Sequence, residues 1–184
     1  GAVVGCINLN GKNNVTIKNV EFDAAKPGIA YDYKLNGKQY ANIITGDKAD
    51  NPLLGARNLV VDGCKFTGTF ANGGACIAFT DQNRTSGSSG NITIKNCTFA
   101  TENTYYNIYA HYSGNGDFVI ENNTFKSQFA AGGPVYLGRY QSSTPVVVKN
   151  NTFVGATQLS DVVYVQDHSN YGVSVNAENN TFTE

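Results

Sequence analysis

The sequence predicts an all-β fold: a single-stranded right-handed parallel β-helix of about six coils, with an inserted β-hairpin near residues 31-40. Two observations carry this prediction. A degenerate segment ending in Asn-x-x-Phe recurs along the chain, and a second short apolar strand follows most of its copies. Composition agrees, because 15% charged residues is low for a helical bundle, while 20 glycines supply turns. The 184 residues are expected to form one domain.

The repeat begins as a strand and ends at a phenylalanine. Each copy opens with alternating apolar and polar residues, as in Ile92 and Ile94 against Thr93 and Lys95, which is the periodicity of a strand with one buried side. The first two copies are followed by insertions, and the later ones are compact. The terminal residues are Phe22, Phe66, Phe99, Phe125, Phe153 and Phe182.

A bend is expected at the same place in every copy, because Asn and Gly tolerate positive φ there. The bend residues are Asn19, Gly63, Asn96, Asn122, Asn150 and Asn179. The next position is expected to face inward and to stack from coil to coil, forming an asparagine ladder in its last three members. This inward column is Val20, Cys64, Cys97, Asn123, Asn151 and Asn180.

The four cysteines are Cys6, Cys64, Cys76 and Cys97. They form no C-x-x-C pair and have no nearby histidine, so a zinc site is not expected and no metal ligands are assigned. Cys64 and Cys97 would lie one strand spacing apart, about 4.8 Å, which exceeds the usual Cβ separation of about 3.8 Å in a disulfide. Stacked free thiols are therefore favoured over a disulfide.

The second strand of each coil presents the strongest candidate site. These strands are Asn42–Asp47, Cys76–Asp81, Asn107–Tyr112, Pro134–Arg139 and Val162–Asp167. Alternation points Ile108, Ala110, Val135, Leu137, Val163 and Val165 inward. It points Tyr109, Tyr136 and Tyr164 outward, one above the next, with His111, Gln166, Tyr140 and His168 beside them. Exposed aromatic rings beside hydrogen-bonding groups suit sugars, although a purely structural tyrosine stack is the favoured interpretation of the column by itself.

The repeat resembles that of the pectate-lyase-like superfamily of parallel β-helix proteins, over residues 15 to 182. The bend and the asparagine ladder carry the resemblance, whereas strands of a β-sandwich do not share one Asn-x-x-Phe signature. The resemblance implies an extracellular, cell-surface or virion-surface location and a polysaccharide or cell-surface glycan as partner. It leaves the activity open, because the superfamily includes lyases, hydrolases, phage tailspikes and adhesins.

Charged residues are expected to form a column at the ends of the second strands. The superfamily's lyases use an arginine or lysine base together with carboxylate-bound calcium. If the protein is an enzyme, the resemblance implies Arg139, Asp167 and Asp81 as its catalytic groups. A structural Arg139–Asp167 ion pair is preferred, because alternation turns Arg139 inward. Glycoside hydrolysis by Asp161 with Asp167, or by Asp47 with Asp81, and calcium binding by the polar loop at Asp47, Lys48, Asp50 and Asn51 are weaker alternatives.

Other functions are disfavoured by composition. The formal net charge of -1 argues against a nucleic-acid partner, and no apolar run is long enough for membrane insertion. No end cap is evident, so a homo-oligomer or a larger extracellular polypeptide is expected. The leading hypothesis is a non-catalytic glycan- or surface-binding module of the adhesin or phage receptor-binding type, without a cofactor. A polysaccharide lyase or hydrolase fragment and a purely structural shaft are the alternatives.

Overall fold

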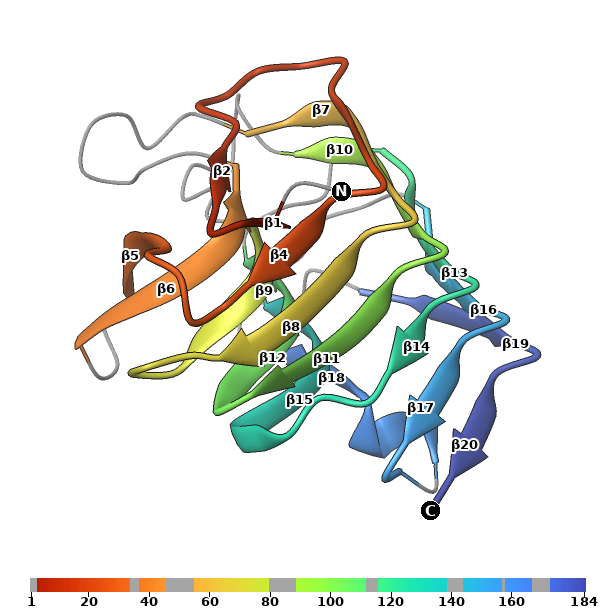
Figure 1. The fold of residues 1–184 in the computed structure, drawn as a ribbon. Helices are drawn as coiled ribbons and strands as arrows, with labels where there is room; N and C mark the ends of the chain where they lie inside the picture. The colour runs from red at the N-terminus through yellow and green to blue at the C-terminus, as the bar shows by residue number, and fades with distance from the viewer. Residues whose placement is uncertain are drawn as a thin grey trace.

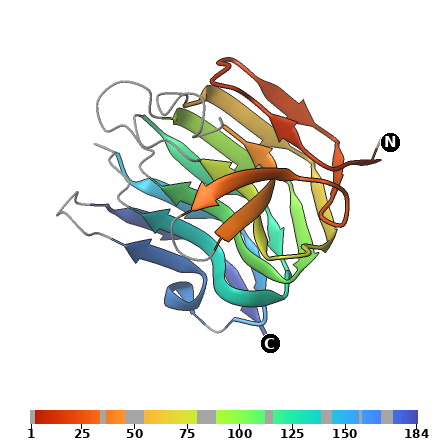
Figure 2. The ribbon, with the colours of Figure 1, turned by 90° about the vertical axis from the view of Figure 1, so that its left-hand side faces the viewer.

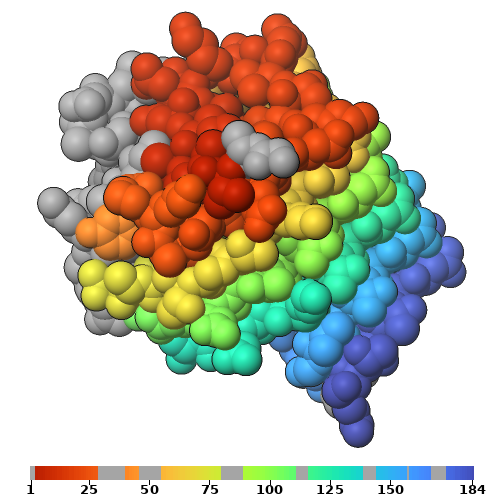
Figure 3. Space-filling view, in the orientation of Figure 1, coloured from red at the N-terminus to blue at the C-terminus, as the bar shows by residue number. Residues whose placement is uncertain are grey.

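The protein is a parallel β-solenoid, in which three sheets wind around one apolar core (Figure 1). The structure is a computed structural model that describes residues 3–33, 37–45, 55–79, 89–111, 116–138, 144–156, 158–166 and 173–184. Figure 3 shows the layers as successive bands from the N-terminus to the C-terminus. The predicted parallel solenoid is therefore confirmed, whereas its hand and its number of coils stay predictions.

Each sheet has one strand order from end to end. The phenylalanine sheet is β1 (Val3–Val4), β4 (Glu21–Asp23), β8 (Lys65–Thr69), β11 (Thr98–Glu102), β14 (Thr124–Phe125), β17 (Thr152–Val154) and β20 (Thr181–Thr183). The charged sheet is β3 (Thr16–Lys18), β7 (Arg57–Asp62), β10 (Gly90–Lys95), β13 (Phe118–Glu121), β16 (Val146–Lys149) and β19 (Val175–Glu178). The tyrosine sheet is β2 (Ile7–Asn8), β6 (Gly37–Ile44), β9 (Gly74–Phe79), β12 (Thr104–His111), β15 (Phe129–Gly138) and β18 (Val163–Gln166).

The phenylalanines that end the repeat form one continuous stack inside the solenoid. Ring centroids are 4.7 to 4.9 Å apart from Phe22 to Phe153 and 5.6 Å apart between Phe153 and Phe182. No two neighbouring rings are tilted by more than 14°. Because parallel strands repeat at about 4.8 Å, identical side chains in register meet face to face and fill the core without gaps.

The predicted bends are confirmed, since the six bend residues have φ between 52° and 65°. The asparagine ladder follows them. The Asn123 amide nitrogen donates to the Ile94 carbonyl at 2.9 Å, and the Asn123 side-chain oxygen accepts from the Cys97 backbone N–H at 2.9 Å. Asn151 repeats the pattern one coil further on. Each side chain thereby satisfies backbone groups that the bend leaves without a strand partner.

A second asparagine ladder, which was not predicted from the sequence, lies on the surface at the N-terminal edge of the charged sheet. Asn58 donates its side-chain amide to Asn14 at 2.8 Å, and Asn91 donates to Asn58 at 3.0 Å. All three residues have positive φ, so each marks a left-handed corner. The signal was an asparagine directly before an apolar strand residue.

Charges of alternating sign follow the outer surface of the charged sheet. Register aligns Lys18, Asp62, Lys95, Glu121, Lys149 and Glu178. Lys18 pairs with Asp62 at 3.3 Å and Lys149 with Glu121 at 3.2 Å. A hydrogen bond from Asn96, and then the charge of Lys18, hold the pKa of Asp62 below its usual value. Like charges on neighbouring coils would destabilise the sheet, and the alternation of sign prevents them from lying directly opposite each other.

The predicted hairpin is confirmed in its backbone. β5 (Ile29–Tyr33) pairs antiparallel with β6, from Ile29 opposite Ala41 to Tyr33 opposite Gly37. β6 is shared, because its second half also pairs in parallel with β9. Figure 2 shows the pair projecting from the side of the solenoid. The turn at residues 34–36 lies outside the described residues.

All four cysteines are free, which confirms the expected thiols. Cys64, Cys76 and Cys97 are fully buried, and Cys6 is half-buried. Burial raises the pKa of the Cys76 thiol to about 12. The burial of Cys64, Cys76 and Cys97 shields all three thiols from reagents in solution.

We therefore expect Ellman's reagent to modify at most one thiol per native chain, at Cys6, and all four thiols in urea. Peptide mapping after alkylation identifies the modified residue. Rapid reaction of two or more thiols in the native protein would contradict the buried positions of the other three.

Candidate aromatic binding site

The predicted tyrosine column is present on the outer side of the tyrosine sheet. Register places Tyr109 beside Tyr136 and Tyr136 beside Tyr164. Their ring centroids are 4.9 Å and 5.7 Å apart, with tilts of 8° and 19°. Towards the N-terminus the same column continues with Ala78 and Ile44. The three rings are therefore stacked on successive strands, as the alternation predicted.

The exposure expected for two of these rings is wrong. Tyr109 and Tyr136 are each 3% exposed, whereas Tyr164 is 54% exposed. The outer side of this sheet carries its own small apolar cluster, in which the two tyrosines pack with neighbouring alanines and an isoleucine. Its members are Ala41, Ile44, Ala75, Ala78, Tyr109 and Tyr136, with Tyr106 packed against them. Only Tyr164 among the three predicted platforms offers a ring to a ligand.

Gln166 supports the stack from the adjacent outward column. It accepts a hydrogen bond from the Tyr136 hydroxyl. Gly138 lies opposite Gln166 in register, and a Cβ at Gly138 would collide with the Tyr136 ring. Tyr136 is therefore held flat against the sheet, and its hydroxyl is directed to the edge strand. This arrangement makes Tyr136 the base on which the exposed Tyr164 ring rests.

The remaining predicted site residues cannot be placed. Of His111 only the backbone is described, which aligns with Gly138. The other residues lie outside the described part of the chain. They are Tyr140 and His168 of the binding face, Arg139, Asp167 and Asp81 of the catalytic alternative, and Asp47, Lys48, Asp50 and Asn51 of the calcium loop.

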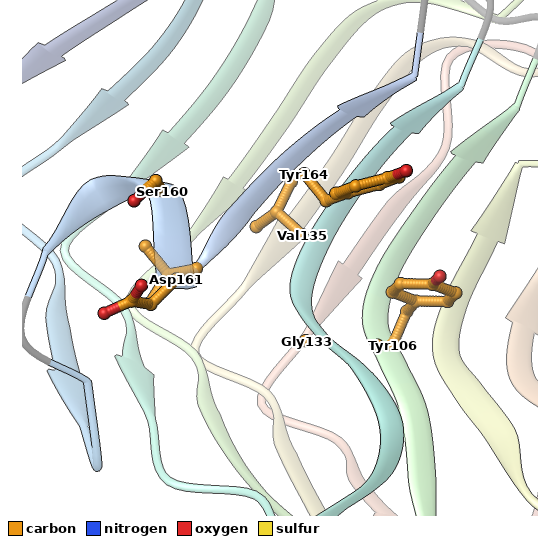
Figure 4. A pocket seen from close by; sticks show the side chains of 8 residues that line it. Tyr106, Gly133, Val135, Ser160, Asp161 and Tyr164 are labelled. Atoms are coloured by element: carbon orange, nitrogen blue, oxygen red, sulfur yellow. The ribbon is translucent and has the colours of Figure 1, made fainter.

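A pocket of about 180 Å³ opens beside the exposed end of the column (Figure 4). Tyr106 lies on one side of it and the short 3-10 helix η1 (Leu159–Asp161) on the other, with Gly133 of β15 between them. Tyr164 borders it as well. The lining residues are Tyr106, Gly132, Gly133, Val135, Ser160, Asp161, Val162 and Tyr164.

Two local features of the sequence create this pocket. Gly132 has φ of 82°, and a Cβ there would lie 2.6 Å from the Tyr106 ring, so only glycine lets the ring lie over the strand. Gly133 adds no side chain to the outward column. In the next coil the chain turns through η1 before β18 begins, so the pocket lies between η1 and Tyr106, with the buried Gly133 as its floor.

The pocket lining is mostly aromatic and neutral. Among the described residues, Asp161 is the one charged residue of the lining, and Figure 4 shows its carboxylate directed away from the tyrosine rings. That carboxylate accepts a hydrogen bond from the Gln158 side chain at 3.2 Å. Among the described residues, no group of three or more His, Cys, Asp or Glu is placed to hold a metal ion. The lining offers ring stacking and hydroxyl groups, and no carboxylate pair.

Four residues of the pocket were not predicted from the sequence: Tyr106, Gly132, Gly133 and Ser160. The available signal was the Gly132-Gly133-Pro134 run within a strand, since glycine in a strand often marks a close approach of backbone or ligand. Val165 lies opposite the core residue Leu137 in register, as alternation predicts, yet it is 38% exposed. Its strand, β18, is the last in the order of the tyrosine sheet.

Together these features define a parallel β-solenoid with an aromatic pocket on one outer surface. Comparison of the chain with protein-family models, curated proteins and solved structures finds no match. A search of the described residues for a helix long and apolar enough to cross a membrane finds none.

Proposed function

We propose that the protein is a non-catalytic, extracellular glycan-binding module, of the kind found in adhesins and phage receptor-binding proteins. The observation that carries the proposal is the 54% exposed Tyr164 ring, which rests on buried Tyr136 beside a pocket lined by Tyr106. Sugar rings have apolar faces that pack on aromatic side chains and polar edges that accept or donate hydrogen bonds. A rigid aromatic platform next to a pocket meets both requirements.

The buried tyrosines contribute to binding from beneath. Because Tyr109 and Tyr136 are stacked and almost fully enclosed, they hold Tyr164 in a fixed orientation before the ligand arrives. Such preorganisation reduces the side-chain entropy that binding would otherwise cost. Gln166 takes part through its hydrogen bond with Tyr136. The partner is a polysaccharide or a cell-surface glycan, and the location is extracellular, on a cell or on a virion.

Two features of the whole fold belong to this proposal: its hand and number of coils, and its association with further protein. We propose that the solenoid is right-handed, with about six coils, because the predicted repeat ends in six phenylalanines and successive strands of each sheet come from successive repeats. We also propose that it acts within a larger polypeptide or a homo-oligomer. Within the described chain, β18, β19 and β20 each end a sheet, and sheet edges invite association.

Replacing Tyr164 tests the platform directly. We expect Tyr164→Ala to weaken glycan binding about ten- to a hundredfold, which corresponds to roughly 1.4 to 2.8 kcal/mol. Tyr164→Phe keeps the ring and should retain most of the affinity. Val154→Ala, which truncates a 44% exposed side chain on a different sheet, serves as the control. Calorimetric titration with a glycan identified on an array measures all three, and unchanged affinity of Tyr164→Ala would count against this site.

The non-catalytic part of the proposal needs its own assay. The array glycans should be incubated with the protein and tested for new reducing ends and for unsaturated sugar products. Binding without either product is the expected result. Formation of a product would overturn the proposal and direct attention to Arg139, Asp167 and Asp81.

A further inference from the structure

We propose that the pocket binds the terminal ring of a neutral glycan, inserted over Gly133 between Tyr106 and the η1 turn. This inference rests on the proposed glycan binding and specifies which part of the glycan is recognised. Three observations lead to it: a gap in a column of outward side chains, the size of the pocket and the absence of a cation from its lining.

The gap follows from the register of the tyrosine sheet. Ala41, Ala75, Tyr106 and Gly133 form one outward column on successive strands. Gly133 contributes no side chain, and the nearest atom to a Cβ built there is the Asp161 carbonyl oxygen at 3.4 Å. Each strand step is about 4.8 Å, so the backbones of Tyr106 and of the η1 coil are separated by roughly two steps. A ring placed over Gly133 would lie about one step from each.

That spacing suits stacking on Tyr106. The rings of Tyr109 and Tyr136, one strand step apart in the neighbouring column, have centroids 4.9 Å apart. The Tyr106 ring is tilted by 34° to Tyr109 and by 42° to Tyr136, so a sugar ring over Gly133 would lie about one strand step from the Tyr106 backbone and pack against this tilted ring. The ligand would thus take the place that a side chain occupies elsewhere in the sheet, with the apolar face of the sugar against the tyrosine.

The pocket has room for one sugar ring, and it is closed at both ends along the outward column. A volume of about 180 Å³ corresponds to roughly six water molecules and lies below the ~300 Å³ at which pockets for drug-sized ligands begin. Tyr106 on one side and η1 on the other block continuation of a chain along the column (Figure 4). An internal unit of a polysaccharide carries a neighbour at each end, whereas a terminal unit carries one and can enter from outside.

The charge of the lining selects a neutral sugar. None of the eight lining residues is a cation, and the one charged group is the Asp161 carboxylate. An acidic sugar would lose hydration without gaining a counter-charge, and it would be repelled by the carboxylate nearby. Hydroxyl groups of the lining residues, from two tyrosines and Ser160, suit the uncharged hydroxyls of a hexose.

Gly133→Ala provides the decisive variant. The new Cβ would meet only the Asp161 carbonyl at 3.4 Å, an ordinary contact, and the backbone there is not left-handed, so the fold should tolerate it. The methyl group would occupy the floor of the pocket. Ala130→Val, on the exposed part of the same strand and outside the lining, is the matched control.

The experiment titrates linear and cyclic neutral glucans of the same linkage, together with the methyl glycosides of glucose, galactose, mannose and N-acetylglucosamine. Tyrosine fluorescence can follow binding, because the chain has no tryptophan. We expect a linear glycan to bind and a methyl glycoside to compete with it. We expect the cyclic form, which has no terminal ring, to bind at least tenfold more weakly. Gly133→Ala should lower affinity at least tenfold, with an unchanged melting temperature, and Ala130→Val should not.

Other results would overturn the inference in distinguishable ways. Equal binding of linear and cyclic glucans would show recognition of internal units, and full affinity of Gly133→Ala would place the ligand outside this pocket; either result leaves the proposed glycan binding intact. A preference for uronic or sialic acid glycans on the array would contradict the neutral ligand alone. If no glycan binds to the unmodified protein, both the inference and the proposed function fail.

Discussion

Asn151→Ala is expected to lower the free energy of unfolding by about 2 to 6 kcal/mol, because it leaves two buried backbone groups without partners at about 1 to 3 kcal/mol each. The Asn151 amide nitrogen donates to the Ile120 carbonyl at 2.9 Å, and its oxygen accepts from the Asn123 backbone N–H at 2.9 Å. Asn151 is 1% exposed, so water cannot replace either bond. The same substitution also breaks side-chain bonds to Asn123 and Asn180, both at 3.1 Å.

The neighbouring asparagine supplies the control. Asn150 is exposed and has φ of 54°, so its role is conformational. Asn150→Gly keeps access to that conformation and should change stability little, whereas Asn150→Ala should cost about 1 to 2 kcal/mol. Urea unfolding of the three variants gives the comparison. A smaller loss for Asn151→Ala than for Asn150→Ala would show that the ladder bonds contribute less than the bend itself.

The solenoid could be predicted because its signals are local and repeated. A bend residue, an inward residue and a phenylalanine recur at fixed offsets, and each position has a direct physical requirement. Asn96 and Asn122 need positive φ, and Phe99 and Phe125 must lie in register for their rings to meet at 4.7 Å. Where one copy of the repeat departs from the pattern, the other copies still identify the role of that position. A repeated pattern therefore carries more structural information than any single strand would.

The burial of Tyr109 and Tyr136 could not be predicted from alternation. Period two tells which side of a strand a residue occupies, but it does not tell what packs on the outer side. Ala75 and Ala78 point outward on the preceding coil and belong to the same cluster. Alternation places Ala78 outward, and this small apolar residue was the available sign that the outer side was covered. Ala75 faces outward because the alternation breaks at Cys76 and Ile77, which both face the inner core.

The pocket could not be predicted from the sequence for a different reason. It is formed by a missing side chain and by a turn in the next coil. Gly133 lacks a side chain where the column would carry one, and the coil that should cover it turns through η1 instead. Both facts concern neighbouring coils, and neither is visible in the pattern of one segment. A missing neighbour also explains the exposure of Val165. Alternation predicts that Val165 faces inward, but its strand is the last of the tyrosine sheet, so no further coil covers it within the described residues.

Phe99→Ala is expected to destabilise the protein by about 3 to 5 kcal/mol, the usual cost of deleting a buried aromatic side chain. Phe99 is fully buried between Phe66 at 4.8 Å and Phe125 at 4.7 Å, so its removal opens a cavity that flat rings on both sides cannot close.

Phe182 provides the comparison at the end of the same stack. It is half-buried and stacks on Phe153 at 5.6 Å, so Phe182→Ala should cost less than half as much as Phe99→Ala. In a solenoid each coil is stabilised mainly by its neighbours. A substitution in a middle coil therefore weakens the contacts with two neighbouring coils, whereas a substitution in the last coil weakens the contacts with one. Urea unfolding followed by circular dichroism measures both variants. Equal losses would mean that the stack contributes through each ring separately and that neighbouring coils are not coupled through it.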